Sequence, residues 1–84
     1  MFVAKVYVTP KTTVSDPEGK TIMGGLKRLG FLMVDDVRAG KYFEIRIQEE
    51  AAHKARSIAE EICGKLLANP VIEEYKFDLQ EIQD

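Results

Sequence analysis

The predicted fold depends on the stretch Val34-Asp35-Asp36-Val37-Arg38-Ala39-Gly40-Lys41-Tyr42-Phe43-Glu44-Ile45-Arg46-Ile47. It reads as two strands rich in β-branched and aromatic residues, folded back at Ala39-Gly40 with a cation on each side of the turn. Side chains alternate along a strand, so every second residue from Phe43 to Ile47 shares one apolar face. The stretch therefore predicts a β-hairpin whose tip exposes Arg38 and Lys41.

The flanking segments predict two helices and two more strands. Residues 2–9 alternate apolar and polar side chains, as in a half-buried strand. Asp16-Pro17-Glu18 is typical of a helix start, and Gly30 of a left-handed cap at the helix end. Residues 49–67 predict the longest helix, and residues 71–79 the last strand. On the long helix, four residues are predicted to form the main apolar stripe: Ala55, Ile58, Ile62 and Leu66.

The order of elements is β-α-β-β-α-β, within one domain over residues 1–84 whose residues 79–84 form a polar tail. Right-handed crossovers place both helices on one face of the sheet. We therefore predict an α+β fold: a ferredoxin-like βαββαβ two-layer sandwich with a four-stranded antiparallel sheet and strands one and three in its centre. Its helix-free face and sheet edges would be open to a partner.

Composition argues against several classes of partner. The net charge is −2, the charges of both signs are interleaved, and no basic stripe predicts a nucleic-acid surface. No window approaches the roughly 20 apolar residues of a membrane span, and the first residues lack the pattern of a signal peptide. A single cysteine excludes an internal disulfide. We expect a cytoplasmic protein that binds neither nucleic acid nor membrane.

The sequence contains no recognisable catalytic or metal-binding constellation. His53 is the only histidine and has no second ligand near it, so we expect it on a helix surface. Cys63 lies in the apolar stripe of the long helix, where a free cysteine behaves as a small hydrophobe. Asp16 and Glu18 favour a helix N-terminus more than an acid–base pair. We predict no catalytic residue, no metal site and no cofactor bound by this chain.

One alternative is an RNA-recognition motif, because Tyr7 and Tyr42 are both expected on the helix-free face, where bases would stack. The stretch from Arg38 departs from the RNP1 pattern, with Ala and Gly at its second and third positions. Glu44 also faces the surface that bases and phosphates would occupy. The pattern disfavours RNA.

Several motifs, taken in order, resemble the PurS subunit family of phosphoribosylformylglycinamidine synthase. They are Val6-Tyr7-Val8-Thr9, Asp16-Pro17-Glu18-Gly19, Leu29-Gly30, Val37-Arg38-Ala39-Gly40-Lys41 and Leu66-Leu67-Ala68-Asn69-Pro70-Val71-Ile72-Glu73-Glu74-Tyr75. The resemblance covers nearly the whole chain and is specific as a set, although no single motif is decisive. Pro10 and the Gly24-Gly25 pair depart from the family pattern.

The resemblance implies a ferredoxin-like homodimer or higher oligomer within an enzyme of purine biosynthesis. The whole enzyme converts formylglycinamide ribonucleotide, glutamine, ATP and water into formylglycinamidine ribonucleotide, glutamate, ADP and phosphate. In the family, a glutaminase subunit releases ammonia and a synthetase subunit binds ATP and magnesium. The small subunit bridges these two and supports passage of ammonia between them.

We expect the partner contacts at the hairpin and at the start of the first helix, because exposed turns and arginine are common in interfaces. A second alternative is an ACT-like module that binds a small molecule. It would need a glycine-bearing turn after the first strand, which Thr9-Pro10-Lys11-Thr12-Thr13 lacks. The candidate partner-contact residues are Asp16, Pro17, Gly19, Arg38, Gly40, Lys41 and Tyr42.

Overall fold

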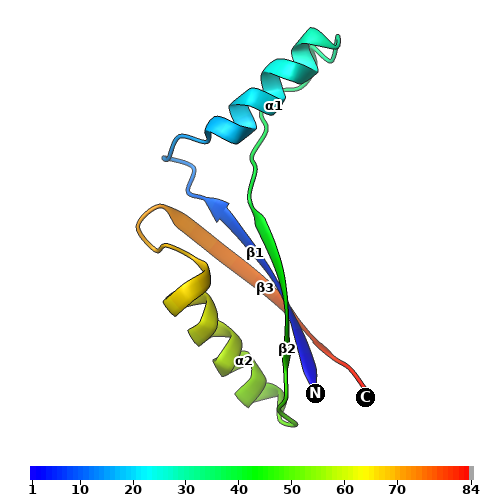
Figure 1. Ribbon diagram of the computed structural model, residues 1–84, viewed down its shortest axis with the longest axis vertical. Coiled ribbons are helices and arrows are strands. Elements are labelled where there is room, and N and C mark those ends of the chain that lie inside the picture. Colours follow the sequence, from blue (N-terminus) through cyan, green and yellow to red (C-terminus); the bar gives the residue numbers. More distant parts are fainter. Residues whose placement is uncertain (84) are drawn as a thin grey trace.

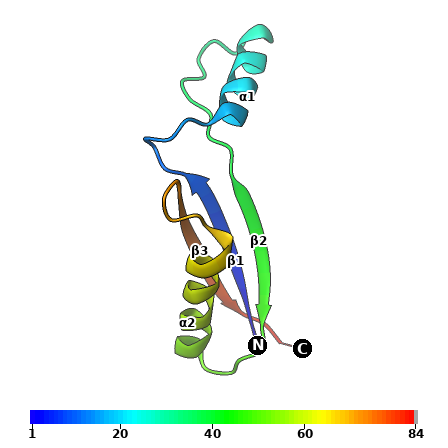
Figure 2. The same ribbon diagram turned by 60° about the vertical axis from the view of Figure 1, so that its left-hand side comes forward.

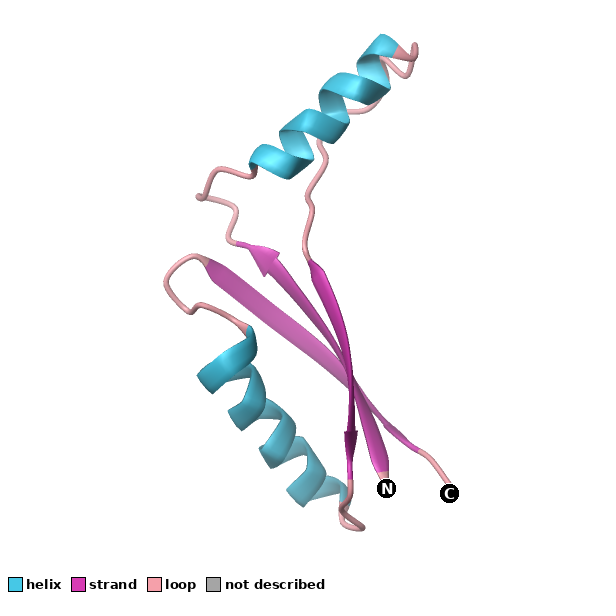
Figure 3. Cartoon of the chain, viewed as in Figure 1, coloured by secondary structure: helices cyan, strands magenta, loops and turns pink. Residues whose placement is uncertain are grey.

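The computed structural model describes residues 1–83, which form three strands and two helices (Figures 1 and 3). The elements follow the order β1 (Phe2–Pro10), α1 (Pro17–Arg28), β2 (Lys41–Ile47), α2 (Ala52–Ile62), the π-helical segment η1 (Cys63–Leu67) and β3 (Glu73–Glu81). The predicted α+β class is confirmed. None of these helices is long and apolar enough to cross a membrane.

The sheet is antiparallel, with strand order β2-β1-β3. Val6 of the central strand lies opposite Phe43 on one side and Phe77 on the other. The described residues contain three strands, and the predicted hairpin at Ala39-Gly40 is wrong, because residues 34–40 connect α1 to β2 without pairing. Two backbone amides of this segment donate to side chains and not to a neighbouring strand. The Val37 amide donates to Asp36, and the Ala39 amide donates to Asp16.

The core lies between α2 and the face of the sheet formed by β1 and β3. The residues of α2 and η1 that reach the sheet are small: Ala55, Ala59 and Cys63 are all buried. Leu66, which was predicted in the apolar stripe, is 81% exposed. Small side chains let the helix approach the sheet closely, and the wider turn of η1 changes the direction of later side chains. The stripe is therefore centred on these three small residues.

The predicted start of α1 is confirmed. The Asp16 side chain accepts from the Gly19 amide, Pro17 is the first helical residue, and Gly30 has a positive φ of 98° just beyond the end. The second helix begins later than predicted, at Ala52, because Glu49 uses its carboxylate to accept hydrogen bonds from the Glu50 and Ala51 amides.

The predicted polar tail over residues 79–84 is partly wrong. Residues 79–81 belong to β3, where Gln80 pairs with Val3, and beyond them the Ile82 amide donates to the Met1 carbonyl. Backbone pairing with the first strand thus continues past the last apolar position of the pattern. Asp84 lies outside the described residues.

Helix α1 does not pack on the sheet. It stands beyond the end of β1 and the start of β2, on the opposite side of the molecule from the chain termini (Figures 1 and 2). The molecule measures 49 × 29 × 14 Å and its radius of gyration is 16.4 Å, against about 12 Å for a compact chain of this length. We refer to α1 and residues 29–33 together as the arm. The layer that α1 was predicted to form over the sheet is absent from the single chain.

Candidate site at the neck of the arm

Two connections, residues 11–16 and 29–40, join the arm to the sheet. Near the sheet they run together, and we call residues 10–19 and 37–40 the neck. Most of the residues predicted to contact partners lie here: Asp16, Pro17, Gly19, Arg38 and Gly40. The structure thus brings together motifs that are separated in the sequence.

Asp16 joins the two connections through its side chain. One carboxylate oxygen, Oδ1, accepts from the Gly19 amide at 3.1 Å, and the other, Oδ2, accepts from the Ala39 amide at 2.8 Å. The residue is only 6% exposed. One carboxylate therefore caps α1 and also binds the segment that leads into β2.

The surroundings of Asp16 favour its ionised form. The hydrogen bonds from the Ala39 and Gly19 amides, followed by the charges of Arg38 and Lys20, hold the pKa of this carboxyl below its ordinary value of 3.8. Asp16 is therefore an anion at neutral pH, and it accepts both hydrogen bonds as a carboxylate.

Arg38 makes the second connection within the neck. Its guanidinium nitrogen Nη2 donates to the carbonyl of Pro10 at 3.1 Å and to the carbonyl of Lys11 at 2.9 Å. These carbonyls lie at the end of β1, so Arg38 ties the second connection back to the sheet. The side chain predicted to extend from a hairpin tip is instead bound to the protein's own backbone.

Two glycines allow the backbones of the neck to approach closely. A Cβ atom at Gly19 would collide with the Val37 carbonyl oxygen, and one at Gly40 would collide with the Val8 carbonyl oxygen. Neither contact can be relieved by turning a side chain, because both obstacles are main-chain atoms. Only glycine fits at these two positions, because there is no room for a Cβ atom.

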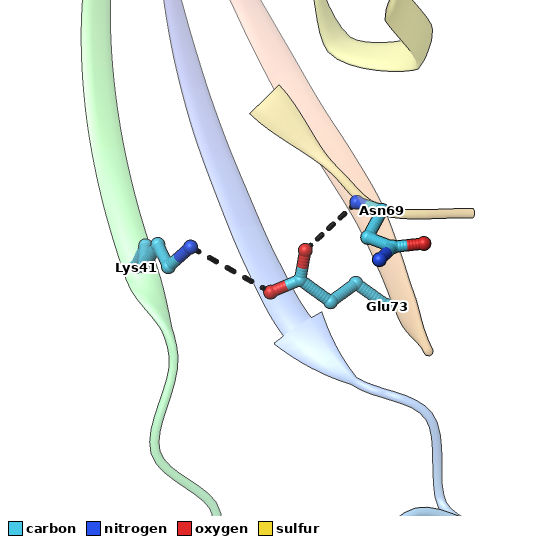
Figure 4. A network of polar contacts seen from close by, with 3 residues as sticks. All are labelled: Lys41, Asn69 and Glu73. Atoms are coloured by element: carbon cyan, nitrogen blue, oxygen red, sulfur yellow. Dashed lines mark hydrogen bonds and ion pairs between the residues drawn. The ribbon is translucent and has the colours of Figure 1, made fainter. Parts of the chain in front are cut away.

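Lys41 begins β2 and faces the turn that precedes β3 (Figure 4). Its ammonium lies 3.8 Å from Oε2 of Glu73, whose other oxygen, Oε1, accepts from the Asn69 amide at 2.8 Å. The Lys41 side chain remains mostly exposed, and exposed ion pairs of this kind contribute at most about 1 kcal/mol. Lys41 is accessible to a partner.

Tyr42 lies apart from the neck, on the helix-free face of the sheet. Its hydroxyl donates to Glu44 at 2.8 Å, and its ring centre lies 5.0 Å from that of Tyr7. The hydrogen bond to Glu44, with desolvation, raises the pKa of Tyr42 to about 12, so the phenol stays protonated and acts as a donor. Beside Tyr7 is an open hollow of about 400 Å³, also lined by Thr9, Glu74, Tyr75 and Lys76.

The two residues weighed as possible chemical sites lie where the sequence predicts. His53 is exposed on α2, and Cys63 is fully buried, where burial raises the pKa of its thiol. Within residues 1–83 no group of three or more His, Cys, Asp or Glu side chains could hold a metal ion. Asp16 and Arg38 of the neck are bound to the protein's own backbone.

Sequence reasoning found the residues of the neck but missed how they are connected. Asp16 was predicted to cap a helix, whereas its second bond, to Ala39, joins segments that are distant in the chain. The carbonyls of Pro10 and Lys11 were missed as acceptors for Arg38. Backbone groups carry no residue-specific signal, so the pattern of side chains could not identify them.

The family model and the related proteins that match this chain all indicate the same family. The family model described as "PurS: Phosphoribosylformylglycinamidine (FGAM) synthase" matches residues 3–81. The phosphoribosylformylglycinamidine synthase subunit PurS of Bacillus subtilis is 40% identical over 82 residues, which is 98% of this chain and 96% of that protein. The same subunit of Methanocaldococcus jannaschii is 40% identical over 83 residues, which is 99% of this chain and 100% of that protein.

Solved structures of the same family superpose on this chain. The crystal structure of Methanocaldococcus jannaschii PurS, described as one of the subunits of formylglycinamide ribonucleotide amidotransferase, superposes with a TM-score of 0.86 and 42% identity, covering 99% of this chain and 100% of that one. A chain in the structure of PurLQS from Thermotoga maritima superposes with a TM-score of 0.83 and 32% identity, covering 94% and 98%. Both superpositions cover at least 94% of this chain.

Proposed function

The chain belongs to the PurS family of phosphoribosylformylglycinamidine synthase, and from this membership we propose that it is the small, non-catalytic subunit of that ligase in purine biosynthesis. The observation that carries the proposal is the family match over residues 3–81, which includes every helix and all of the strands except Phe2, the first residue of β1. The likeness to a chain of the Thermotoga maritima PurLQS structure supports a role within a larger assembly.

Within that enzyme, the chain contacts the glutaminase and the synthetase subunits and supports the transfer of ammonia between them. ATP and magnesium bind the synthetase subunit, and this chain binds no cofactor of its own. Family membership also supports the cytoplasmic location expected from the sequence. The ACT-like and RNA-binding alternatives are not favoured, because the family match accounts for residues 3–81.

We propose that the chain also binds to itself. Its accessible surface is 6160 Å², about 1,100 Å² more than the roughly 5,000 Å² expected for a compact protein of this mass. A standard protein–protein interface buries about 800 Å² on each partner. The excess therefore matches the surface that one stable interface would cover.

The uncovered surfaces are on α1 and on β2. On the apolar stripe of the arm, Ile22 of α1 is 43% exposed and Leu29, the residue that follows α1, is 75% exposed. Phe43 and Ile45 of β2 face the same side of the sheet as the core but are only half-buried, because α2 lies over β1 and β3. In our proposal, α1 of a second copy covers this half of the sheet. The two-layer, ferredoxin-like arrangement is then completed between chains.

Co-purification tests the assignment to the enzyme. A tagged chain should retain a glutaminase and an ATP-dependent synthetase from a lysate supplied with glutamine, ATP and magnesium, and retain less of both when these are omitted. Retention of single-stranded RNA instead would support the RNA-binding alternative, and calorimetric binding of a free amino acid would support the ACT-like one. If neither large subunit is retained under any condition, the assignment is wrong.

A further inference from the structure

The orientation of α1 depends on the neck. Helix α1 has almost no contact with the three strands or with α2. It is joined to them by two connections, and a helix held only by flexible chain would have no fixed orientation. Whatever fixes the arm in a single chain must therefore lie where the connections meet the sheet.

In the neck, two side chains make bonds that join separate segments. Asp16 links the first connection to the second through the Ala39 amide, and Arg38 links the second connection to the end of β1 through the Pro10 and Lys11 carbonyls. In both cases the donor lies on the second connection, as the Ala39 amide or the Arg38 guanidinium, and the acceptor lies on residues 10–16. We propose that Asp16 and Arg38 are positioning residues that hold α1 at a fixed orientation to the sheet.

Two carboxylates on the second connection, Asp35 and Asp36, do not share this role. Asp36 accepts its hydrogen bond from Val37, the next residue in the chain, so it cannot join the two connections. Asp35 is exposed on the same connection. The position of a carboxylate, and not acidic charge alone, distinguishes Asp16.

A fixed arm matters for assembly, and this consequence rests on the proposed function. An interface formed by a pre-ordered element loses less conformational freedom on binding than one formed by a mobile element. The charged neck residues would then act on assembly indirectly, through the orientation of the apolar stripe on α1. They need not touch a partner.

Distance measurement on the full chain tests the proposal. Nitroxide labels are placed at Arg28→Cys on α1 and Gln80→Cys on β3, both exposed positions, while the buried Cys63 is left unchanged. All of these chains also carry Ile22→Glu, which should prevent α1 from packing on a second copy. The labelled chain is diluted with unlabelled chain, so that pulsed electron resonance reports the orientation of the arm within one chain. The parent should give one narrow distance peak, and Asp16→Ala should lose it in favour of a broad distribution.

Arg38→Ala should broaden the distribution as well, and because Arg38 is exposed this variant is expected to fold even if Asp16→Ala does not. Asp16→Asn keeps one acceptor oxygen and should give an intermediate width. Asp35→Ala is the matched control and should keep the parental peak. Circular dichroism checks that each variant retains its strands and helices.

Parental narrow peaks in the folded Asp16→Ala and Arg38→Ala variants would overturn the proposal. The measurement needs no other subunit, so it stands apart from the assignment to the enzyme. Failure to co-purify the large subunits would refute the proposed function and leave these distances unchanged.

Discussion

Asp16 accepts hydrogen bonds from two amides, that of Gly19 in the first turn of α1 and that of Ala39 on the second connection. Half of this role could be predicted from the sequence, because an Asp before a Pro at a helix start is a local pattern. The other half could not, because the Ala39 amide becomes a donor only through the path of residues 34–40. Arg38 is a similar case. The sequence identified it as a candidate contact residue, but it could not identify its acceptors, because they are backbone carbonyls.

The lowered pKa of Asp16 predicts a dependence of stability on pH. A carboxyl whose folded pKa lies below its unfolded value of about 3.8 stabilises the fold above that pH, and this contribution is lost as the pH falls through the folded pKa. The advantage of the parent over Asp16→Asn in the free energy of unfolding should therefore shrink as the pH is lowered from about 6 to about 2.

Urea denaturation at a series of pH values measures this difference. Glu49 also has a lowered pKa, from hydrogen bonds that its carboxylate accepts from the Ala51 and Glu50 amides. Because Glu49 is present in both proteins, its contribution cancels in the comparison. A difference that stays constant across the range would contradict the assigned role of the Asp16 charge.

Close packing in the neck predicts the effect of a small substitution. In Gly19→Ala the new methyl group would meet the Val37 carbonyl oxygen and the Asp16 carboxylate, so we expect a loss of about 1–3 kcal/mol of unfolding free energy. Gly64→Ala is the control, because no atom beyond its chain neighbours and the backbone of its own helix lies within 4 Å of the added Cβ. It should be neutral or stabilising by up to about 1 kcal/mol. Equal stabilities for the two variants in urea denaturation would argue against a tight neck.

At the scale of elements, segments with a regular apolar pattern were predicted well, whereas the connections between them were not. The alternation in residues 2–9 and the capping pattern at Asp16 each gave the correct element. The same alternation is weak over residues 34–38, where Asp35 and Asp36 are adjacent, and no strand forms there. Local periodicity could not show that backbone amides in this segment bind side chains instead of a neighbouring strand.

The apolar stripe of the second helix gives a prediction that separates the sequence pattern from the structure. The pattern places Leu66 in the core, where its loss would cost about 2–5 kcal/mol. In the structure Leu66 is 81% exposed, so Leu66→Ala should change the unfolding free energy of the chain by no more than about 0.5 kcal/mol.

The complementary variant is Ala59→Leu. Ala59 is 1% exposed between α2 and the sheet, and a larger side chain there should destabilise the chain by about 1–3 kcal/mol. Thermal or urea unfolding of both variants gives the comparison. A larger loss from Leu66→Ala than from Ala59→Leu would show that the helix is rotated relative to the structure described here.

At the scale of the whole molecule, the sequence predicted both helices packed on one face of their own sheet, whereas in the structure only α2 packs there. The apolar residues of α1 are compatible with either arrangement. An amphipathic helix can cover its own sheet or the sheet of another copy. A sequence pattern shows that an apolar face of the sheet must be covered. It does not show whether the covering helix comes from the same chain or from a second copy. In our proposal, the arm and the uncovered half of the sheet form the interface between copies.

Self-association should depend on the stripe of α1. Ile22→Glu places a charge on the surface proposed to cover a second copy, and it should shift sedimentation from oligomer toward monomer. Thr21→Glu adds the same charge at the neighbouring exposed position and serves as the control. If Ile22→Glu sediments like the parent, α1 does not form the interface between copies.

The most direct measurement of the central claim is reconstitution of the enzyme. The glutaminase and synthetase subunits are combined with formylglycinamide ribonucleotide, glutamine, ATP and magnesium, and formation of the amidine product is followed with and without this chain. Our account predicts that adding the chain increases the rate of glutamine-dependent product formation, and that an ammonium salt in place of glutamine supports product formation even without it. An unchanged glutamine-dependent rate when the chain is omitted would contradict its assignment as the subunit that joins the two activities.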